Sequence, residues 1–324
     1  MNKITSFLKL IRYKNLLVYA ICLLLIRINV IDIFYAKYGI VSSIPMSVYI
    51  LFVIAFILAM AGGYIMNDYN DQQIDDINRL DKNIYVGRTI QPQSAKILAY
   101  SMSIASVIFA FVFDRMAHFF ASTTIFFLIF AFIIDKSYNK LKNIFIGKNI
   151  FIAIIPVLLV FIPILLEYIK INANDGMLNT FGNDIALTRN IVLWFAILLF
   201  LISFIREIVK DMQDAKGDKQ FGVKTIITKY DEKKTKHIIY ILTFTLIALV
   251  LTFQIIYLRV NPLALLVGVT ILVHIPLIYF LVELKKASIV QDYGFLSDLL
   301  SMLFISILFV TFFARTIIIC GSLI

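Results

Sequence analysis

Asn67-Asp68-Tyr69-Asn70-Asp71-Gln72-Gln73-Ile74-Asp75 follows directly on a long apolar run that ends near Met66. Its three carboxylates, Asp68, Asp71 and Asp75, are spaced i, i+3 and i+7, which predicts that they share one narrow stripe of a helix. Three like charges on one stripe repel one another. A cation between them removes that repulsion, and carboxylate oxygens suit Mg²⁺ or Ca²⁺. The alternative is a solvated helix end with surplus acid.

A second stretch repeats this pattern. Asp211, Asp214 and Asp218 have the same spacing and also follow the end of an apolar run. The chain has only 20 acidic residues, so two such triads are hard to explain as solubilising charge. Both stretches are interleaved with cations, which are Arg79, Lys82, Arg206, Lys210 and Lys216. Carboxylates for a metal, with Lys and Arg for oxyanions, predict a site for a metal-bound diphosphate.

Composition places the chain in a membrane. Its 324 residues are 61% hydrophobic, whereas soluble domains are nearer about 45–50% apolar. Apolar runs of about 20 residues recur along the whole length, which predicts an all-α polytopic membrane protein. No cleavable signal peptide is recognised. The net charge of +10 fits the positive-inside bias and anionic headgroups, and no soluble basic domain supports a nucleic-acid partner.

Nine apolar runs predict nine transmembrane helices in a bundle, forming a single domain over residues 1–324. Because the triads follow the second and sixth runs, we expect two related halves. The link near Asp114 and Arg115 is short, so runs three and four should form an antiparallel pair. The runs lie near 14–34, 47–66, 95–113, 117–134, 149–168, 190–208, 237–258, 261–283 and 296–319.

Charge counting orients this bundle. With the N-terminus inside, the inner segments hold 22 Lys and Arg residues and the outer segments hold seven. This asymmetry predicts a cytoplasmic N-terminus in the cell inner membrane or its equivalent. Both triads follow even-numbered runs, so the candidate site is expected on the cytoplasmic face.

Three residues inside the apolar runs need separate expectations. Arg27 lies about a dozen residues into the first run. We expect it to snorkel at the outer end, or the span to end before it, and the alternative is an intramembrane functional charge. Cys22 and Cys320 have no metal-ligand spacing, so we expect buried small hydrophobes.

The two aspartate stretches resemble motifs of the UbiA superfamily of intramembrane prenyltransferases. Asn67 through Asp75, continued by Ile77-Asn78-Arg79, is similar to that family's first motif, and Arg206 through Asp218 is similar to the second. Tyr138 through Lys142 looks like the family's Tyr-x-x-x-Lys, and Arg12 and Asn15 sit where many members carry Arg and Asn. The resemblance covers essentially the whole chain.

The chain departs from the family after Arg79. Many members continue with Pro and a basic residue, then another Pro and a Ser-Gly pair. Here Lys82 supplies the basic residue, as a point charge and not as a bidentate fork. Both prolines are missing, so we expect a looser loop over the site and an effect on the choice of acceptor.

The resemblance implies a prenyl diphosphate donor, Mg²⁺ as cofactor, and a lipid or aromatic acceptor among membrane lipids. Six aspartates would hold two Mg²⁺ ions that bridge diphosphate oxygens. Other residues would bind the diphosphate or contact the reacting centre. The catalytic group then comprises Asp68, Asp71, Asp75, Asp211, Asp214, Asp218, Lys142 and Tyr138. The substrate-binding group comprises Asn67, Arg79, Lys82, Arg206, Lys210, Arg12 and Asn15.

The acceptor stays open between two kinds. The Asn-Asp-Tyr start of the first motif and the Arg-Glu-Ile-x-Lys-Asp second motif look most like members that alkylate geranylgeranylglyceryl phosphate or related lipids. Members with an aromatic acid acceptor, which act in quinone biosynthesis, are the alternative. An ion-coupled transporter is an alternative of another class, because intramembrane acids beside cations also occur there.

Overall fold

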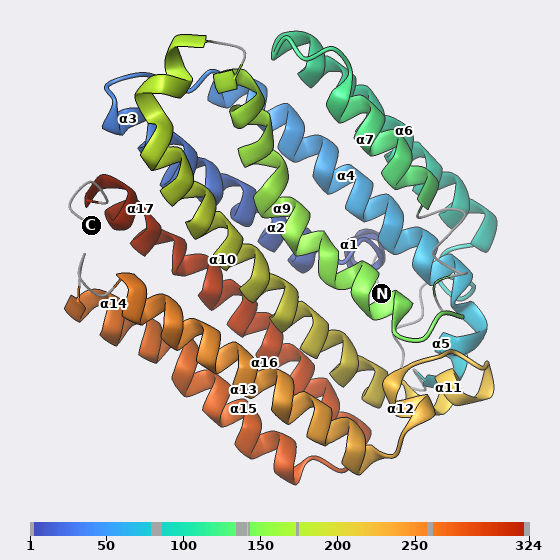
Figure 1. Ribbon diagram of the computed structural model, residues 1–324. Coiled ribbons are helices and arrows are strands. Elements are labelled where there is room, and N and C mark those ends of the chain that lie inside the picture. The colour runs from blue at the N-terminus through green and yellow to red at the C-terminus, as the bar shows by residue number, and fades with distance from the viewer. Residues whose placement is uncertain are drawn as a thin grey trace. The chain divides into compact units, whose positions relative to one another are not determined.

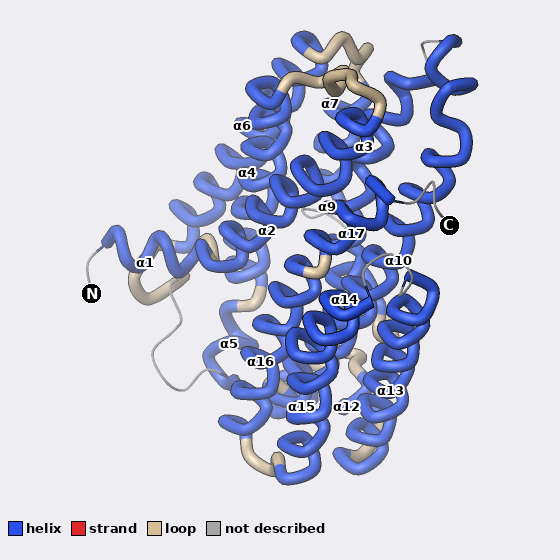
Figure 2. Tube along the Cα trace, turned by 90° about the vertical axis from the view of Figure 1, so that its left-hand side faces the viewer, coloured by secondary structure: helices blue, strands red, loops and turns tan. Residues whose placement is uncertain are grey.

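The protein is all-helical. The computed structural model describes residues 3–78, 86–133, 141, 143–172, 175–257 and 262–320. Within these ranges there is no β-strand, only one isolated bridge between Val86 and Ile90 (Figure 2). The predicted all-α class is therefore confirmed.

The helices follow the apolar runs of the sequence (Figure 1). The first part of the chain contains α1 (Lys3–Leu10), α2 (Tyr13–Ile26), η1 (Arg27–Ile31), α3 (Asp32–Lys37), α4 (Met46–Asn70), α5 (Gln72–Asn78), α6 (Pro92–Met116) and α7 (Ser122–Phe132). The rest contains α9 (Gly147–Asn172), α10 (Asp175–Gln213), α11 (Ala215–Gln220), α12 (Ile226–Lys229), α13 (Glu232–Tyr257), α14 (Pro262–Val269), η3 (Thr270–His274), α15 (Ile275–Lys286), α16 (Val290–Phe309) and α17 (Thr311–Cys320).

Among the described residues, eight helical segments are long and apolar enough to cross a membrane. They correspond to all the predicted spans except the fourth, and their ends differ from the predicted ones by several residues. The fourth predicted span corresponds to α7, whose described part has only 11 residues. Residues 134–140, which would continue it, lie outside the described ranges.

The chain divides into two compact units that alternate along the sequence. Unit 1 contains residues 1–21, 44–148 and 215–224, and unit 2 contains residues 22–43, 149–214 and 225–324. The first aspartate stretch lies in unit 1, whereas the second is shared, since Asp211 and Asp214 belong to unit 2 and Asp218 to unit 1. The predicted single domain stays a prediction.

Unit 1 is built on the close packing of α4 against α6 (Figure 1). Gly62 makes this approach possible, because a Cβ at that position would lie 2.9 Å from Ser103 Oγ and 3.0 Å from the Ala99 carbonyl oxygen. Ser106 donates a hydrogen bond of 2.7 Å to the Ala55 carbonyl oxygen across the same interface. Small residues therefore allow two apolar helices to approach closely, as membrane helices commonly do.

The predicted pair formed by runs three and four is present as α6 and α7 (Figure 1). Asp114 near the end of α6 accepts hydrogen bonds from the backbone N–H and the hydroxyl of both Thr123 and Thr124. Both threonines lie in the first turn of α7, where backbone N–H groups have no partner within the helix. Asp114 thus caps the neighbouring helix and fixes the tight connection between the two.

Unit 2 is organised around α10, which packs along α16 and α13 (Figure 1). α10 presents fully or almost fully buried apolar side chains in its second half, including Leu199, Ile205 and Val209. On the facing helix α16, Leu300 and Leu303 are buried in the same way. The second aspartate stretch therefore begins at the end of the best-packed helix of this unit.

The expectation for Arg27 was wrong. Arg27 is 2% exposed and lies inside the candidate span Tyr13–Lys37, at the start of the π-helix η1. Its guanidinium contacts Glu167 at 2.6 Å and Asp32 at 3.0 Å. Because these carboxylates compensate its charge inside the protein, Arg27 does not need to reach water. Cys22 is buried, as expected, whereas nothing is described of the Cys320 side chain.

Replacing Asp114 tests the link between α6 and α7. We expect Asp114→Ala to lower the free energy of unfolding by about 2 kcal/mol, since it leaves the first turn of α7 without its cap. Asp76→Ala is the matched control, because Asp76 pairs with Arg88 on the surface, where ion pairs contribute little. Thermal unfolding in detergent measures both, and equal midpoints for the two variants would contradict this role of Asp114.

Candidate active site

The first aspartate stretch forms the join between two helices of unit 1. Asp68 lies in the last turn of α4, Asp71 lies between the helices, and Asp75 lies in α5. The expected uninterrupted helical stripe was therefore wrong in detail. Helical hydrogen bonds continue across the join, from Asp71 N to the Asn67 carbonyl oxygen at 2.9 Å and from Asp75 N to the Asp71 carbonyl oxygen at 2.8 Å. These two bonds preserve the helical hydrogen-bond pattern across the join. The three aspartates therefore remain in helical order along the chain.

The second stretch has the same local architecture. Asp211 lies in the last turn of α10, Asp214 lies between helices, and Asp218 lies in the short helix α11. The Asp214 N–H donates to the Lys210 carbonyl oxygen at 2.9 Å, which is the bond that Asp71 makes in the first stretch. Both long helices thus end one residue before the middle aspartate of a triad. This shared register supports two related halves, but duplication itself stays a prediction.

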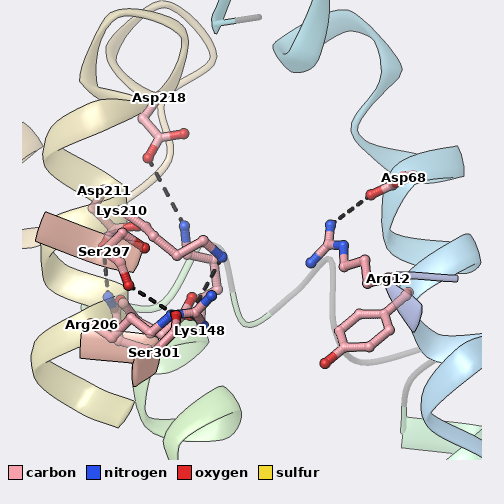
Figure 3. Close-up of polar contacts among 12 residues, drawn as sticks. Arg12, Asp68, Lys148, Arg206, Lys210, Asp211, Asp218, Ser297 and Ser301 are labelled. Atoms are coloured by element: carbon pink, nitrogen blue, oxygen red, sulfur yellow. Dashed lines mark hydrogen bonds and ion pairs between the residues drawn. The ribbon is translucent and has the colours of Figure 1, made fainter. Parts of the chain in front are cut away.

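A strained turn holds Arg12 against the first triad. Arg12 joins α1 to α2 with a φ of +53°, a left-handed conformation that is uncommon for residues other than glycine. Its guanidinium contacts Asp68 at 2.7 Å (Figure 3) and lies 4.8 Å from the centre of the Tyr64 ring. Asp68 is only 8% exposed, so the arginine compensates a largely buried carboxylate. Such strain at a non-glycine residue commonly marks a functional position.

A close contact joins the end of the first stretch to the end of the second. Within unit 1, α5 packs against α11, and the Gly217 N–H donates a hydrogen bond of 2.7 Å to Asn78 Oδ1. A Cβ at Gly217 would lie 2.5 Å from that oxygen, so any side chain at this position would displace Asn78. We call this contact the Asn78–Gly217 clasp. It fixes Asp218, the residue after Gly217, relative to the first stretch.

The N-terminal turn of α9 contacts the second stretch. Lys148 lies 4.0 Å from Asp218 in unit 1 (Figure 3), and in unit 2 Asn149 donates a hydrogen bond of 2.6 Å to Asp211. Asp211 is 1% exposed and Asp218 is 4% exposed. Sequence reasoning missed both partners. The signal was a Lys-Asn pair at the start of an apolar span, where polar groups are costly unless they have a task.

Arg206 and Lys210 are held on α10 in unit 2. Both contact Glu207 at 3.4 Å, and Arg206 Nε donates a hydrogen bond of 2.7 Å to Ser301 Oγ (Figure 3). Their side chains keep 25% and 30% of their surface exposed. Glu207 therefore orders two cations at the approach to Asp211 without burying their charges.

The remaining predicted residues fall into two groups. Asn15 lies in the first turn of α2, where its N–H donates to the Arg12 carbonyl oxygen at 2.8 Å, and Asn67 lies in the last turn of α4. The other group consists of residues outside the described ranges, which are Arg79, Lys82, Tyr138 and Lys142.

Comparison with known proteins identifies the family. The model of the UbiA prenyltransferase family matches residues 24–308. The chain belongs to this family. The sequence resemblance is thus confirmed, and with it the nature of the protein as an integral membrane protein with prenyltransferase relatives.

Relatives and solved structures agree with this assignment. Digeranylgeranylglyceryl phosphate synthase of Methanopyrus kandleri is 27% identical over 173 residues, 53% of this chain, and the chain spans only 54% of that protein's length. A solved digeranylgeranylglyceryl phosphate synthase structure aligns over 98% of this chain and 99% of its own, with a TM-score of 0.53 and 22% identity. The structure of a UbiA homolog from Archaeoglobus fulgidus bound to DMAPP and Mg²⁺ aligns over 95% and 99%, with the same TM-score and 16% identity. These two structures support the fold.

The residues of this UbiA family member fit a divalent cation. The described residues contain no ready cluster of three His, Cys, Asp or Glu side chains. Mg²⁺ does not require one, because it is commonly bound by one or two carboxylates together with phosphate oxygens and water. Asn67 directly precedes Asp68 in the sequence. Its Oδ1 atom is buried and has no hydrogen-bond partner in the described structure. A buried oxygen without a donor is suited to a cation or to a ligand that donates.

The Asn78–Gly217 clasp can be tested without any substrate. We expect Asn78→Ala to speed hydrogen exchange of the α11 amides about tenfold, since one partly buried hydrogen bond between α5 and α11 is lost. Gly217→Ala should do the same by steric expulsion of Asn78, and the double variant should add little because both remove one contact. Mass spectrometry of peptides from residues 215–224 measures the exchange. Gln73→Ala and Lys219→Ala are controls on the exposed faces of α5 and α11, and equal exchange in all variants would refute the clasp.

Proposed function

We propose that this UbiA family member transfers a prenyl group from a prenyl diphosphate to a membrane-associated acceptor in a Mg²⁺-dependent reaction. The observation that carries the proposal is the shared register of the two triads, each of which joins a long apolar helix to a short one. The Asn78–Gly217 clasp supports the proposal further, because it fixes Asp218 relative to the first aspartate stretch. A metal-bound diphosphate needs carboxylates to hold its metal ions, and the two acidic joins would supply them.

The side chains of this chain would bind and orient the diphosphate. Arg206 and Lys210 keep exposed surface and can donate to phosphate oxygens, as charged nitrogen donors do well. Lys148 and Arg12 would keep the buried carboxylates in place. Because negative charge grows on the diphosphate as its bond to the prenyl group breaks, fixed cations stabilise the transition state more than the ground state. Further donors proposed from the sequence are Arg79, Lys82, Lys142 and Tyr138.

Mg²⁺ would supply Lewis-acid stabilisation of the leaving diphosphate. The ligands proposed for it are the carboxylates of the two triads, which are Asp68, Asp71, Asp75, Asp211, Asp214 and Asp218. Asn67 would contribute its buried oxygen. Asn15 would act near Arg12 at the start of the second helix.

A glycerophosphate lipid is the proposed acceptor. The support is that relatives are named digeranylgeranylglyceryl phosphate synthase, and that the solved structure with 22% identity carries the same name. Geranylgeranylglyceryl phosphate or a related lipid is therefore the acceptor to test first. An aromatic acid of quinone biosynthesis is the alternative outcome of the same test.

An assay of purified protein tests the function directly. We expect labelled geranylgeranyl diphosphate and geranylgeranylglyceryl phosphate to yield diphosphate and a product whose mass is that of the acceptor plus the prenyl group minus the hydrogen it replaces, in Mg²⁺ but not in excess chelator. 4-Hydroxybenzoate serves as the second acceptor. Product from the aromatic acid alone would replace the lipid acceptor, and no product from any prenyl diphosphate and acceptor would refute the proposed reaction.

Single charge removals test the triads. We expect Asp71→Asn and Asp214→Asn each to reduce kcat/KM by about 100-fold or more, because each removes one ligand charge with hardly any change of shape. The double variant should be scarcely worse than the worse single variant, as is usual for residues that act as a unit. Turnover with fixed donor and acceptor measures this, with size exclusion in detergent as the folding check.

Asp76→Asn is the matched control for that experiment. Asp76 neighbours Asp75 in α5 but is exposed and pairs with Arg88. We expect it to turn over at the wild-type rate. Near-normal turnover in either Asp71→Asn or Asp214→Asn would remove that triad from the mechanism.

The proposed orientation places the N-terminus and both triads on the cytoplasmic side. Its support is the count of 22 Lys and Arg residues on the inner segments against seven on the outer ones. Cysteines introduced at Gln91 and Lys219 should react with a membrane-impermeant maleimide only after the cells have been permeabilised. Labelling of these positions in intact cells would reverse the orientation.

A further inference from the structure

Unit 2 contains a cavity that the proposed reaction does not use. Its volume is about 240 Å³, and it lies between η1, α3, α9 and the first part of α10, which meet at one end of the unit (Figure 1). Its walls are mostly aliphatic and aromatic, and the other three side chains, Glu167, Thr188 and Arg189, are polar. The lining residues are Ile31, Phe34, Tyr35, Phe161, Ile164, Leu165, Glu167, Tyr168, Ile171, Ile185, Thr188, Arg189 and Val192.

One polar part of the wall is already satisfied. Glu167 is 4% exposed and accepts hydrogen bonds from Arg27 at 2.6 Å, Tyr35 at 2.9 Å and Ser42 at 2.6 Å. The carboxylate charge is compensated by the buried guanidinium, and three donors occupy its oxygens. This network therefore forms a rigid wall and offers no strong attraction to a cationic ligand.

Two other polar groups of the wall lack partners. Thr188 Oγ1 is buried, in a residue that is 8% exposed, and it makes no hydrogen bond in the described structure. Arg189, which follows it, makes no ion pair with any residue that the structure describes. A buried hydroxyl without a partner is costly. Both groups donate, so a ligand that satisfies them must offer acceptor oxygens and, for the arginine, negative charge.

The cavity is lined by residues near the ends of membrane-spanning segments, which is the depth at which lipid headgroups are expected. Thr188 and Arg189 lie within α10, directly before its long apolar run, which begins at Ile191. Tyr35 lies two residues before the end of the span Tyr13–Lys37. The ends of apolar runs of spanning length meet lipid headgroups, whereas residues further inside meet acyl chains. A ligand here can therefore place a polar group at the headgroup level and an apolar chain along Phe161 and Ile164.

We propose that this cavity binds a phosphate-bearing membrane lipid. The lipid phosphate would accept from Thr188 and pair with Arg189, and the first segment of one chain would fill the apolar part of the cavity. The volume is below the range of about 300–1,000 Å³ typical of pockets that enclose a whole small molecule, which fits partial entry of a lipid. None of its residues belongs to the two triads, so this proposal does not rest on the proposed reaction.

Native mass spectrometry of the delipidated full-length protein tests the site. Three probes separate the sources of affinity: phosphatidylglycerol, glycerol 3-phosphate as the phosphate without chains, and diacylglycerol as the chains without phosphate. We expect one tightly bound phosphatidylglycerol and at least about tenfold weaker binding of the other two. Binding of glycerol 3-phosphate as tight as that of the lipid would overturn the lipid proposal in favour of a free phosphate ester.

Matched variants locate the bound lipid. Thr188→Val keeps the shape and removes the hydroxyl, and Arg189→Gln removes the charge. We expect each to weaken phosphatidylglycerol binding about tenfold, because each removes a hydrogen bond to a charged group. Arg315→Gln is the control, since Arg315 is an exposed arginine of unit 2 that does not line the cavity.

Each outcome of this comparison decides the proposal. Loss of binding in Thr188→Val and Arg189→Gln, with wild-type binding in Arg315→Gln, supports the site. Unchanged binding in both cavity variants overturns it, and so does an equal loss in the arginine control, which would indicate general surface charge. A thermal melt of each variant without lipid separates loss of folding from loss of binding.

Discussion

The mutual repulsion of carboxylates at the ends of apolar helices is the constraint on which the site depends. Each triad places its acids where a long helix leaves the hydrophobic part of the protein. Asp211 and Asp218 are almost fully buried, and Asp68 is only slightly exposed. Such groups need compensation by cations or donors. The described structure gives each of them one: Arg12 for Asp68, Asn149 for Asp211 and Lys148 for Asp218. The proposed metal-bound diphosphate would add further positive charge at these carboxylates and further acceptors for the surrounding cations.

The same constraint explains why the polar segments are braced by small or strained residues. Gly217 lets α11 approach α5 closely enough for the clasp, and the left-handed Arg12 turns the chain so that its guanidinium reaches Asp68. Neither Gly217 nor the Arg12 turn buries additional apolar surface. Both fix charged groups whose geometry would otherwise be set by repulsion, which is the kind of preorganisation that catalysis requires. An ion-coupled transporter would not be expected to need two acidic joins in one register, and the family assignment agrees with an enzyme.

Much of the fold and part of the site could be predicted from the sequence. Hydropathy located the helices, because a segment that crosses a bilayer must be apolar over its full length. The position of each aspartate triad after an apolar run predicted that it follows a long helix, and the structure places the triads at the ends of α4 and α10, where each continues into a short helix. Partners distant in sequence could not be predicted this way. The contacts of Arg27 with Glu167 and of Asn78 with Gly217 join residues 140 and 139 positions apart. Periodicity carries no information on such pairs, so Arg27 was expected at the membrane surface and the clasp was missed.

The most direct test of the central claim is the affinity of the purified protein for geranylgeranyl diphosphate, measured by calorimetry with and without Mg²⁺. If the carboxylates hold the diphosphate through a divalent cation, the two ligands must strengthen each other's binding reciprocally. The account predicts that Kd falls about 100-fold between excess chelator and saturating Mg²⁺. An affinity that is the same in both conditions would contradict it, since the acidic triads would then play no part in holding the donor.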